Sequence, residues 1–501
     1  MNKSTIQTLI DKVIGKKGLI RVPSWWMRKV LMQMADWVKE GNDANSEKIV
    51  KIDEDTTKLR NLTLPYMLVS GTGIVNIDGN RISFTDADKQ LMFITGAINF
   101  KKGDDYIDNP IAYIYIPHLD VRSQGRDMAF MFYRCSDLTS LNVTGFDTSA
   151  VTSMESMFNG CSNLTSLVLT GFNTSAVTKM DNMFNSCWNL ASLDLSSFNT
   201  SAVTTMNSMF HQCFGLTSLD LTGFNTSAVT NINAMFAGCS KLTSLDLSSF
   251  DTSAVTSMGY IFNGCSKLTS LNLTGFNTSA ITNMDSMFCR CSSLTSLDVT
   301  RFNTSAVTSM RSMFESCYGL TSLDITRFDT SAVTNMASMF RGCSKLTSLN
   351  VTGFDTSSVM NMDSMFNGCR KLTSLDLSSF NTSVVTSMEG MFYSCLSLTS
   401  LNLSSFDTSM VTKLWMLFDD CKSLTSLILG PNFFKASYNY VDFSYSTQWT
   451  NDTVVTSLVT NSYDRATAGL KTMTLKLSAN TKAALTDEQK AAITAKGYTI
   501  A

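Results

Sequence analysis

A period of 26 residues is the strongest constraint that this sequence places on its fold. A phenylalanine recurs at this spacing from Phe146 to Phe406, and a cysteine recurs in the same register from Cys135 to Cys421. A unit of this length cannot bury its apolar face alone, so neighbouring units must stack into a continuous core. The cysteine column therefore predicts twelve stacked turns.

One unit, residues 161–186, illustrates the local pattern. Its first part alternates as a short strand, with Leu164, Leu167 and Leu169 facing inward and Ser166 and Val168 facing outward. After a turn at Gly171, apolar residues follow at helical spacing: Val177, Met180, Met183, Phe184 and Cys187. We expect an α/β solenoid in which each turn is strand, loop and helix.

The two ends of the chain differ from this array. All five prolines lie outside the regular units, and Pro117 and Pro431 bracket them. We therefore divide the chain into a helical segment (1–50), a small β region with an N-terminal cap (51–117), the solenoid (118–430) and a C-terminal α+β cap (431–501). In that last part, residues 473–477 alternate as a strand. Thr486 and Gln489 form a capping box for a helix that stops at Gly497.

The first hundred residues predict helices followed by strands. A capping box at Ser4 and an N-cap at Ser24 each precede a predicted helix. Both helices carry an apolar stripe that suits docking or self-association. Residues 66–100 alternate as strands, with Asp78-Gly79 as a hairpin turn. The candidate attachment or oligomerisation residues are Ile6, Ile10, Val13, Trp25, Trp26, Met27, Leu31, Met34 and Val38.

Composition argues against several functions. The 39 Lys and Arg residues nearly cancel the 41 Asp and Glu residues, so no net field favours nucleic acid or an anionic membrane. Asp11 and Lys12 interrupt any secretory apolar run, and no stretch is long enough for a membrane span. With two histidines, no nucleophile elbow and no phosphate-binding loop, we expect neither an enzyme nor a cofactor.

Two repeated columns of side chains have competing interpretations. Cysteines 26 residues apart suit a buried thiol ladder better than zinc or disulfides, since zinc sites need close pairs and stacked Cβ atoms are too far apart for a disulfide. An acidic column, which begins at Asp194 and Asp220 and includes interspersed asparagines, is either a solvated ladder or a cation site. We expect no metal. The repeated Asn-Thr-Ser triplets suit turn chemistry rather than glycosylation.

Recognition is expected where bulky residues replace the small ones of the repeat. Trp188 and Phe214 fill one slot on adjacent turns, with His211 nearby, and aromatic platforms among hydroxyl groups suit glycans. The alternative is that these rings simply cover the solenoid surface, and that Arg301 and Arg327 are solvated rather than bound to an anion. The other candidates are Tyr260, Tyr318 and Tyr393.

The unit MxxMFxxCxxLTSLxLxxF[DN]TSxVT, over residues 128–430, resembles the 26-residue leucine-rich repeats of the bacterial surface protein type. This family is known from adhesins of gut and oral bacteria and from mycoplasma surface lipoproteins. The resemblance implies a leucine-rich-repeat-type superhelix and a role in adhesion, without fixing a ligand. Residues 15–42 resemble the start of structural proteins from tailed phages of gut bacteria.

Together these features predict a non-enzymatic phage virion protein, a fibre or tail adhesin. It would be made in the host cytoplasm, attach through its N-terminus to virion proteins or to itself as a homo-oligomer, and bind a host surface glycan or protein through the solenoid. We expect neither nucleic-acid binding nor membrane insertion. The alternatives are a bacterial cell-surface adhesin and a structural spacer of the virion.

Overall fold

The computed structural model describes residues 66–77, 80–93, 98–100, 109, 111–116, 119–120, 127–143, 146–430, 433–435, 440–444, 455–460 and 462–501. The predicted N-terminal helices, Asp78-Gly79, Pro117 and Pro431 lie outside these residues. The chain divides into two compact units, Met1–Ala228 and Val229–Ala501. Among the described residues, no helix combines the length and apolar character needed to cross a membrane.

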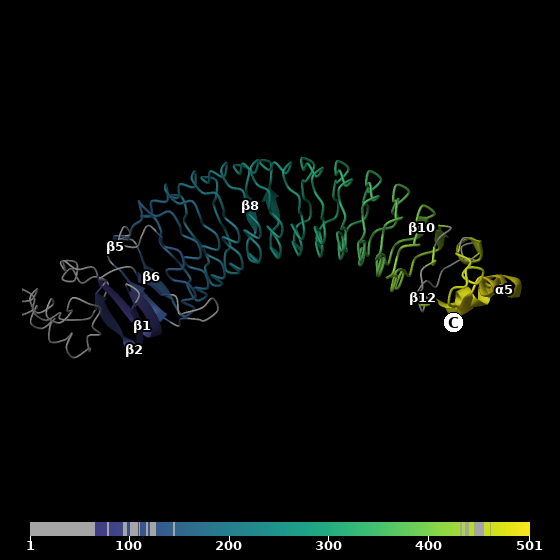
Figure 1. Ribbon diagram of the computed structural model, residues 1–501, viewed down its shortest axis with the longest axis horizontal. Coiled ribbons are helices and arrows are strands. Elements are labelled where there is room, and N and C mark those ends of the chain that lie inside the picture. Colours follow the sequence, from purple (N-terminus) through teal and green to yellow (C-terminus); the bar gives the residue numbers. More distant parts are fainter. Residues whose placement is uncertain are drawn as a thin grey trace, which may run out of the picture. The chain divides into compact units, whose positions relative to one another are not determined.

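Unit 1 begins with a sheet whose strands are ordered β2-β1-β4-β6. Strands β1 (Tyr66–Ile77) and β2 (Asn80–Phe93) form the predicted antiparallel hairpin, with Ile77 opposite Asn80. Strand β4 (Ile111–Tyr115) pairs antiparallel with β1 and parallel with β6 (Ser140–Asn142), while β3 (Ile98–Asn99) pairs with β1. Strand β5 (Leu119–Asp120) pairs with β7 (Phe146–Asp147). The hairpin sheet thus leads directly into the first turns (Figure 1).

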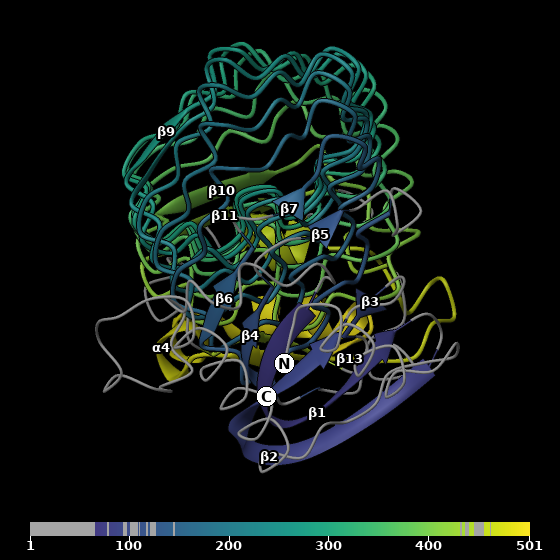
Figure 2. The ribbon, with the colours of Figure 1, turned by 90° about the vertical axis from the view of Figure 1, so that its left-hand side faces the viewer.

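The repeats form a β-solenoid with turns of 26 residues. Parallel pairs join β8 (Ser244–Asp246) to β9 (Ser270–Asn272) and β10 (Ser400–Leu403) to β11 (Ser426–Leu429) in unit 2. Nine isolated parallel bridges also connect equivalent positions one turn apart, such as Ser153 with Lys179. The structure therefore supports about nine regularly bridged turns rather than the twelve counted from the cysteine column, because bridges are missing at some steps. Figure 2 shows the blue turns of unit 1 overlying one another around a common interior.

The interior of each turn holds the side chains that the alternation predicted. Leu164, Leu167 and Leu169 are buried, and Val168 is 54% exposed. The phenylalanines of the MF pairs stack in columns, with ring centroids 5.6 Å apart between Phe158 and Phe184. Such columns leave no room for water between turns, so each turn is stabilised mainly by its neighbours.

The predicted helix in each turn is wrong. Ser156 and Gly160 have φ values of 54° and 79°, and such a pair of left-handed residues four positions apart recurs in each turn. Instead of bonding within a helix, the N–H groups of Phe158 and Gly160 donate to Met183 and Asn185 in the next turn. The segment is a run of tight turns, because alternate N–H groups donate to the next turn of the solenoid and the others close four-residue β-turns.

The Asx-Thr-Ser triplets close the opposite corner of each turn. Thr174 is buried, and its hydroxyl donates to the carbonyl of Asn199 at 2.9 Å and accepts from the Asn199 N–H at 2.8 Å. Within the triplet, Asn173 Oδ1 accepts from the N–H of Ser175. The predicted turn chemistry is confirmed, and the triplet is a connector between turns.

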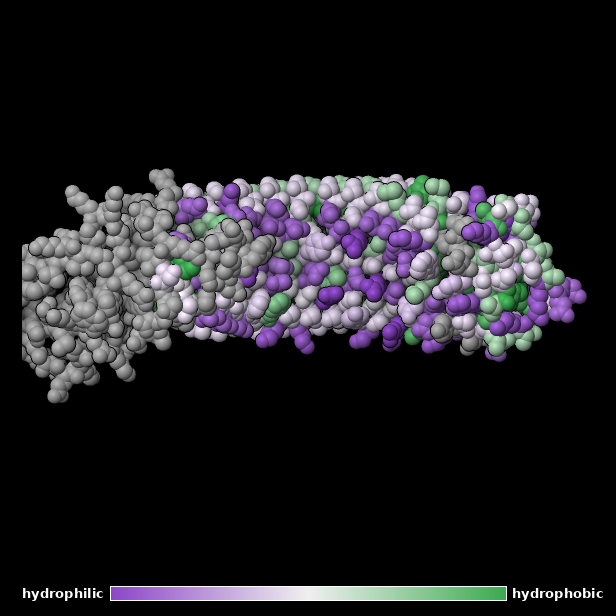
Figure 3. All heavy atoms as spheres, turned by 60° about the horizontal axis from the view of Figure 1, so that its bottom comes forward, coloured by the Kyte–Doolittle hydropathy of each residue, from purple (hydrophilic) through white to green (hydrophobic). Residues whose placement is uncertain are grey.

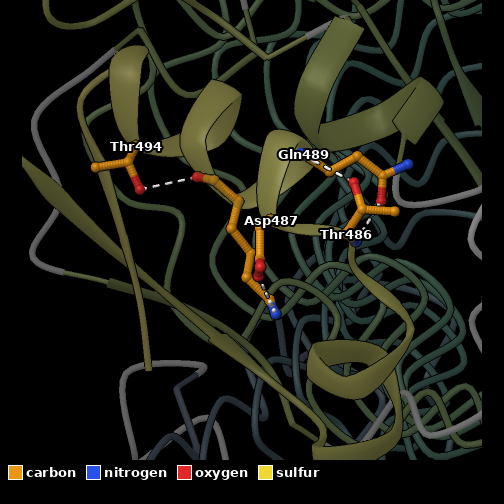
Figure 4. Close-up of polar contacts among 5 residues, drawn as sticks. Thr486, Asp487, Gln489 and Thr494 are labelled. Carbon is orange, nitrogen blue, oxygen red and sulfur yellow. Dashed lines mark hydrogen bonds and ion pairs between the residues drawn. The ribbon is translucent and has the colours of Figure 1, made fainter.

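The C-terminal part of unit 2 is a small α+β layer, as predicted. Its sheet has the order β12-β13-β14, formed by Tyr440–Phe443, Met473–Leu477 and Tyr498–Ile500. Its helical elements are η3 (Val455–Thr460), α4 (Ala479–Ala484) and α5 (Asp487–Ala495). Figure 4 shows the expected capping box of α5, in which Thr486 and Gln489 exchange hydrogen bonds.

Candidate recognition surface

An exposed pair of aromatic rings on adjacent turns of unit 1 is the most distinctive departure from the repeat. Trp188 is 47% exposed and Phe214 is 39% exposed, and their ring centroids lie 6.3 Å apart with an angle of 33° between planes. Each ring follows a buried cysteine, in a slot that Ser162 fills in the preceding turn. The repeat register therefore brings together two rings that are far apart in sequence, as predicted.

A cluster of uncharged polar side chains precedes the two rings on the same turns. Ser186 Oγ lies 2.8 Å from Asn185 Oδ1 and 3.1 Å from Gln212 Oε1, so its single proton is shared between these two amide oxygens. Asn185 Nδ2 donates to Asn182 Oδ1 at 2.8 Å. His211 Nδ1 lies 3.3 Å from Asn185 Oδ1. The residues that precede Trp188 and Phe214 thus form one connected network.

Burial lowers the pKa of His211, because the half-buried imidazolium would lose hydration. The ring is therefore neutral near pH 7. The other side chains of the network and the two aromatic rings carry no charge. This cluster is thus uncharged. Figure 3 shows that on the face in view hydrophilic residues surround scattered hydrophobic ones along the solenoid.

The repeat region matches a known protein family. A family model described as "Mycoplasma protein of unknown function, DUF285" matches residues 126–244, 215–322 and 317–430. These matches together span more than half of the 501 residues. The chain belongs to the DUF285 family. No curated protein matches it significantly. The DUF285 matches cover the β-solenoid turns and leave out both the hairpin sheet and the C-terminal layer.

The remaining aromatic candidates of this DUF285 chain lie in unit 2. Tyr260 and Tyr318 are exposed, at 40% and 50%, and Tyr393 is half-buried. Within the described residues of unit 2, none of the three stacks on another aromatic ring. A Cβ added at Gly342 would lie 3.1 Å from Tyr318 Cε1, so the Tyr318 ring covers the backbone of the next turn. These are single rings rather than a platform.

Arg301 and Arg327 occupy one slot on adjacent turns of the DUF285 array, and both are exposed. Each lies near an aspartate three residues earlier. Hydrogen bonds from Thr300 and, to a smaller extent, the charge of Arg301 lower the pKa of Asp298. Hydrogen bonds from Thr326 and then the charge of Arg327 act in the same way on Asp324. Neighbouring carboxylates therefore offset the positive charge that an anionic ligand would need.

The cysteine column is a ladder of buried thiols, as predicted. The thirteen cysteines are free and buried, and Cys187 Sγ donates to the carbonyl of Phe158 at 3.2 Å. Burial raises the pKa of Cys187 to about 12. Within the described part of the DUF285 chain, no group of three or more His, Cys, Asp or Glu residues is placed to hold a metal ion.

The acidic column consists of exposed carboxylates engaged in local turns. Asp220 Oδ1 accepts from the N–H of Thr222 at 3.0 Å and from its hydroxyl at 2.7 Å. These backbone and side-chain hydrogen bonds lower the pKa of Asp220. Local hydrogen bonds thus offset repulsion along the column, which agrees with a solvated ladder.

Two features of the DUF285 chain escaped sequence reasoning. One is the amide network, which replaces the glycine that fills the slot of Ser186 and Gln212 in several other turns, and that replacement was the available signal. The other is a group of exposed apolar residues on successive turns of unit 2, whose conservative character gave little warning. Its members are Met360, Val384, Met410 and Met416.

Proposed function

We propose that the chain is a non-enzymatic phage virion protein, a fibre or tail adhesin that attaches through its N-terminus. Its β-solenoid presents a surface for recognition of the host. The observation that carries this proposal is the exposed Trp188–Phe214 pair. Exposure of two adjacent aromatic rings to water is unfavourable, and a bound partner that covers the rings would remove that unfavourable contact. The resemblance of residues 15–42 to phage structural proteins supports placement on a particle.

A bacterial cell-surface adhesin is the second candidate. The match to a family described as Mycoplasma proteins favours it, since Mycoplasma is a cellular organism. The recognition surface would be the same in both cases. The two candidates differ only in what carries the solenoid.

Localisation separates these candidates. Antibodies against the full-length protein are applied to purified phage particles from a lysed culture and to intact uninfected cells of the producing strain. Labelling of particles alone supports the virion protein, and labelling of uninfected cell surfaces supports the adhesin. Particle labelling combined with failure of the purified protein to bind any host cell would leave a structural spacer.

A further inference from the structure

Three features of unit 1 together define a ligand class for the aromatic pair. The first is the platform itself, in which Trp188 and Phe214 present two tilted rings 6.3 Å apart. Aromatic faces bind apolar C–H surfaces, and a tryptophan also offers an N–H at its edge. The platform consists of two side chains only. It therefore suits a small ligand with C–H faces.

The second feature is a set of polar groups left for a ligand. Among the described residues, Trp188 Nε1 and Gln212 Nε2 have no hydrogen-bond partner, and His211 Nε2 has none either. The Ser186 hydroxyl donates to Gln212 Oε1, and this hydrogen bond restrains the orientation of the amide N–H donors before a ligand binds. Hydroxyl groups of a sugar both donate and accept, and they complement amide, indole and imidazole nitrogens.

The third feature is the absence of charge in this cluster. Asn185, Ser186 and Gln212 are neutral side chains, and His211 stays neutral near pH 7 because it is half-buried. An anionic sugar or a phosphate would lose hydration here without meeting a cation. A neutral sugar meets no such cost.

We propose that Trp188 and Phe214 bind an uncharged glycan, whose hydroxyl groups accept a hydrogen bond from the Gln212 amide and donate one to Nε2 of the neutral His211 ring. The rings contact the apolar C–H faces of the sugar, and the amide network sets its orientation. This inference rests on the proposed recognition function and names its ligand class.

Binding of the purified full-length protein to an array of neutral and anionic oligosaccharides tests the proposal. The expected result is binding to neutral members that weakens about tenfold or more in Trp188→Ala/Phe214→Ala. Tyr318→Ala is the matched control, because Tyr318 fills the same slot as a single ring and should leave binding unchanged. Binding of anionic members alone, or neutral binding that survives the double substitution, would overturn the proposal.

Gln212→Glu tests the hydrogen-bonding role separately. The substitution keeps an oxygen that accepts the hydrogen bond from Ser186, but it removes the Nε2 donor. Binding of neutral glycans should therefore weaken several-fold. Unchanged binding would overturn the role of this amide. Thermal unfolding of each variant must match that of the wild type.

Periodate treatment of host cells distinguishes failure of this inference from failure of the proposed function. Periodate cleaves the vicinal diols of sugars, so glycan recognition predicts that treated cells lose binding. Cells that bind the protein equally well after treatment would refute the glycan and keep the recognition function. Absence of binding to any untreated host cell would refute the recognition function itself.

Discussion

Thr174 and Asn199 exchange two hydrogen bonds between neighbouring turns, one in each direction through the same hydroxyl oxygen. Equivalent pairs recur along the array, for example between Thr278 and Asn303. Because these threonines are buried, both backbone groups of the asparagine depend on a single side chain. The triplet therefore holds the spacing between turns at one corner of the solenoid.

Replacement of this hydroxyl should destabilise the array locally. Thr174→Val keeps the shape of the side chain but leaves the N–H and carbonyl of Asn199 without partners, which we expect to cost about 2–3 kcal/mol. Thr178→Val is the control, because Thr178 is exposed and its backbone N–H still bonds to Thr152. Hydrogen exchange around each site measures the effect, and equal protection in both variants would contradict it.

At a left-handed position, replacement by glycine should give a more stable protein than replacement by alanine, whereas in a helix alanine would be the more stable. Ser338 has a φ of 58°, so Ser338→Gly should be more stable than Ser338→Ala by about 0.5–1 kcal/mol. In a helix the same comparison would favour alanine by about 1 kcal/mol. Urea unfolding of the two variants gives the answer, and greater stability of the alanine variant would restore the helical interpretation.

Asp419 should make the C-terminal end of unit 2 less stable as the pH rises. Burial, followed by the charge of Asp442, raises its pKa from 3.8 to about 6, and its buried Oδ1 has no hydrogen-bond partner. Since the folded state binds this proton more tightly, its stabilising effect is full below pH about 4 and is lost as the pH rises through about 6. Because the residue is partly exposed, Asp419→Asn should stabilise the protein by only about 1 kcal/mol at neutral pH.

The neighbouring Asp420 provides the control for this prediction. Although burial opposes it, hydrogen bonds from Lys422 and Ser394 hold the pKa of Asp420 below its ordinary value. Asp420→Asn should therefore leave stability unchanged or lower it slightly. Thermal unfolding between pH 4 and pH 8 follows both variants, and a Tm of Asp419→Asn that tracks the wild type at every pH would rule out the role of Asp419.

The thiol ladder should be inert in the folded protein. Burial raises the pKa of Cys265 and Cys343 to about 12, so almost no thiolate forms at mildly alkaline pH. An aromatic disulfide reagent should label the native protein negligibly and all thirteen cysteines after unfolding in guanidinium. Rapid labelling of several thiols without unfolding would show that the ladder is more open than described.

The sequence predicted which side chains face inward but not the backbone that carries them. The structure buries Val177, Met180 and Phe184, as a helix would also have done. A helix and a run of tight turns can both place residues at this spacing on one face. The difference lies in the residues between them. Asn182 and Ser186 have φ values of 54° and 59°, and serine, asparagine or glycine recurs at these slots with poor helix propensity.

The candidate site was predicted in part for a similar reason. Repeat register alone placed Trp188 beside Phe214, since equivalent slots of adjacent turns must be neighbours. The link between Ser186 and Gln212 could not be predicted, because it depends on rotamers and on the left-handed backbone at both residues. The C-terminal capping box was predictable because its contacts are local.

Binding of labelled full-length protein to intact host cells tests the central claim most directly, with wild type, Trp188→Ala/Phe214→Ala and Tyr318→Ala compared at equal concentration. We predict that the wild type and Tyr318→Ala bind equally and that the double variant loses at least about nine-tenths of its binding, as expected for paired aromatic anchors. Full binding by a correctly folded double variant would contradict recognition through the Trp188–Phe214 pair.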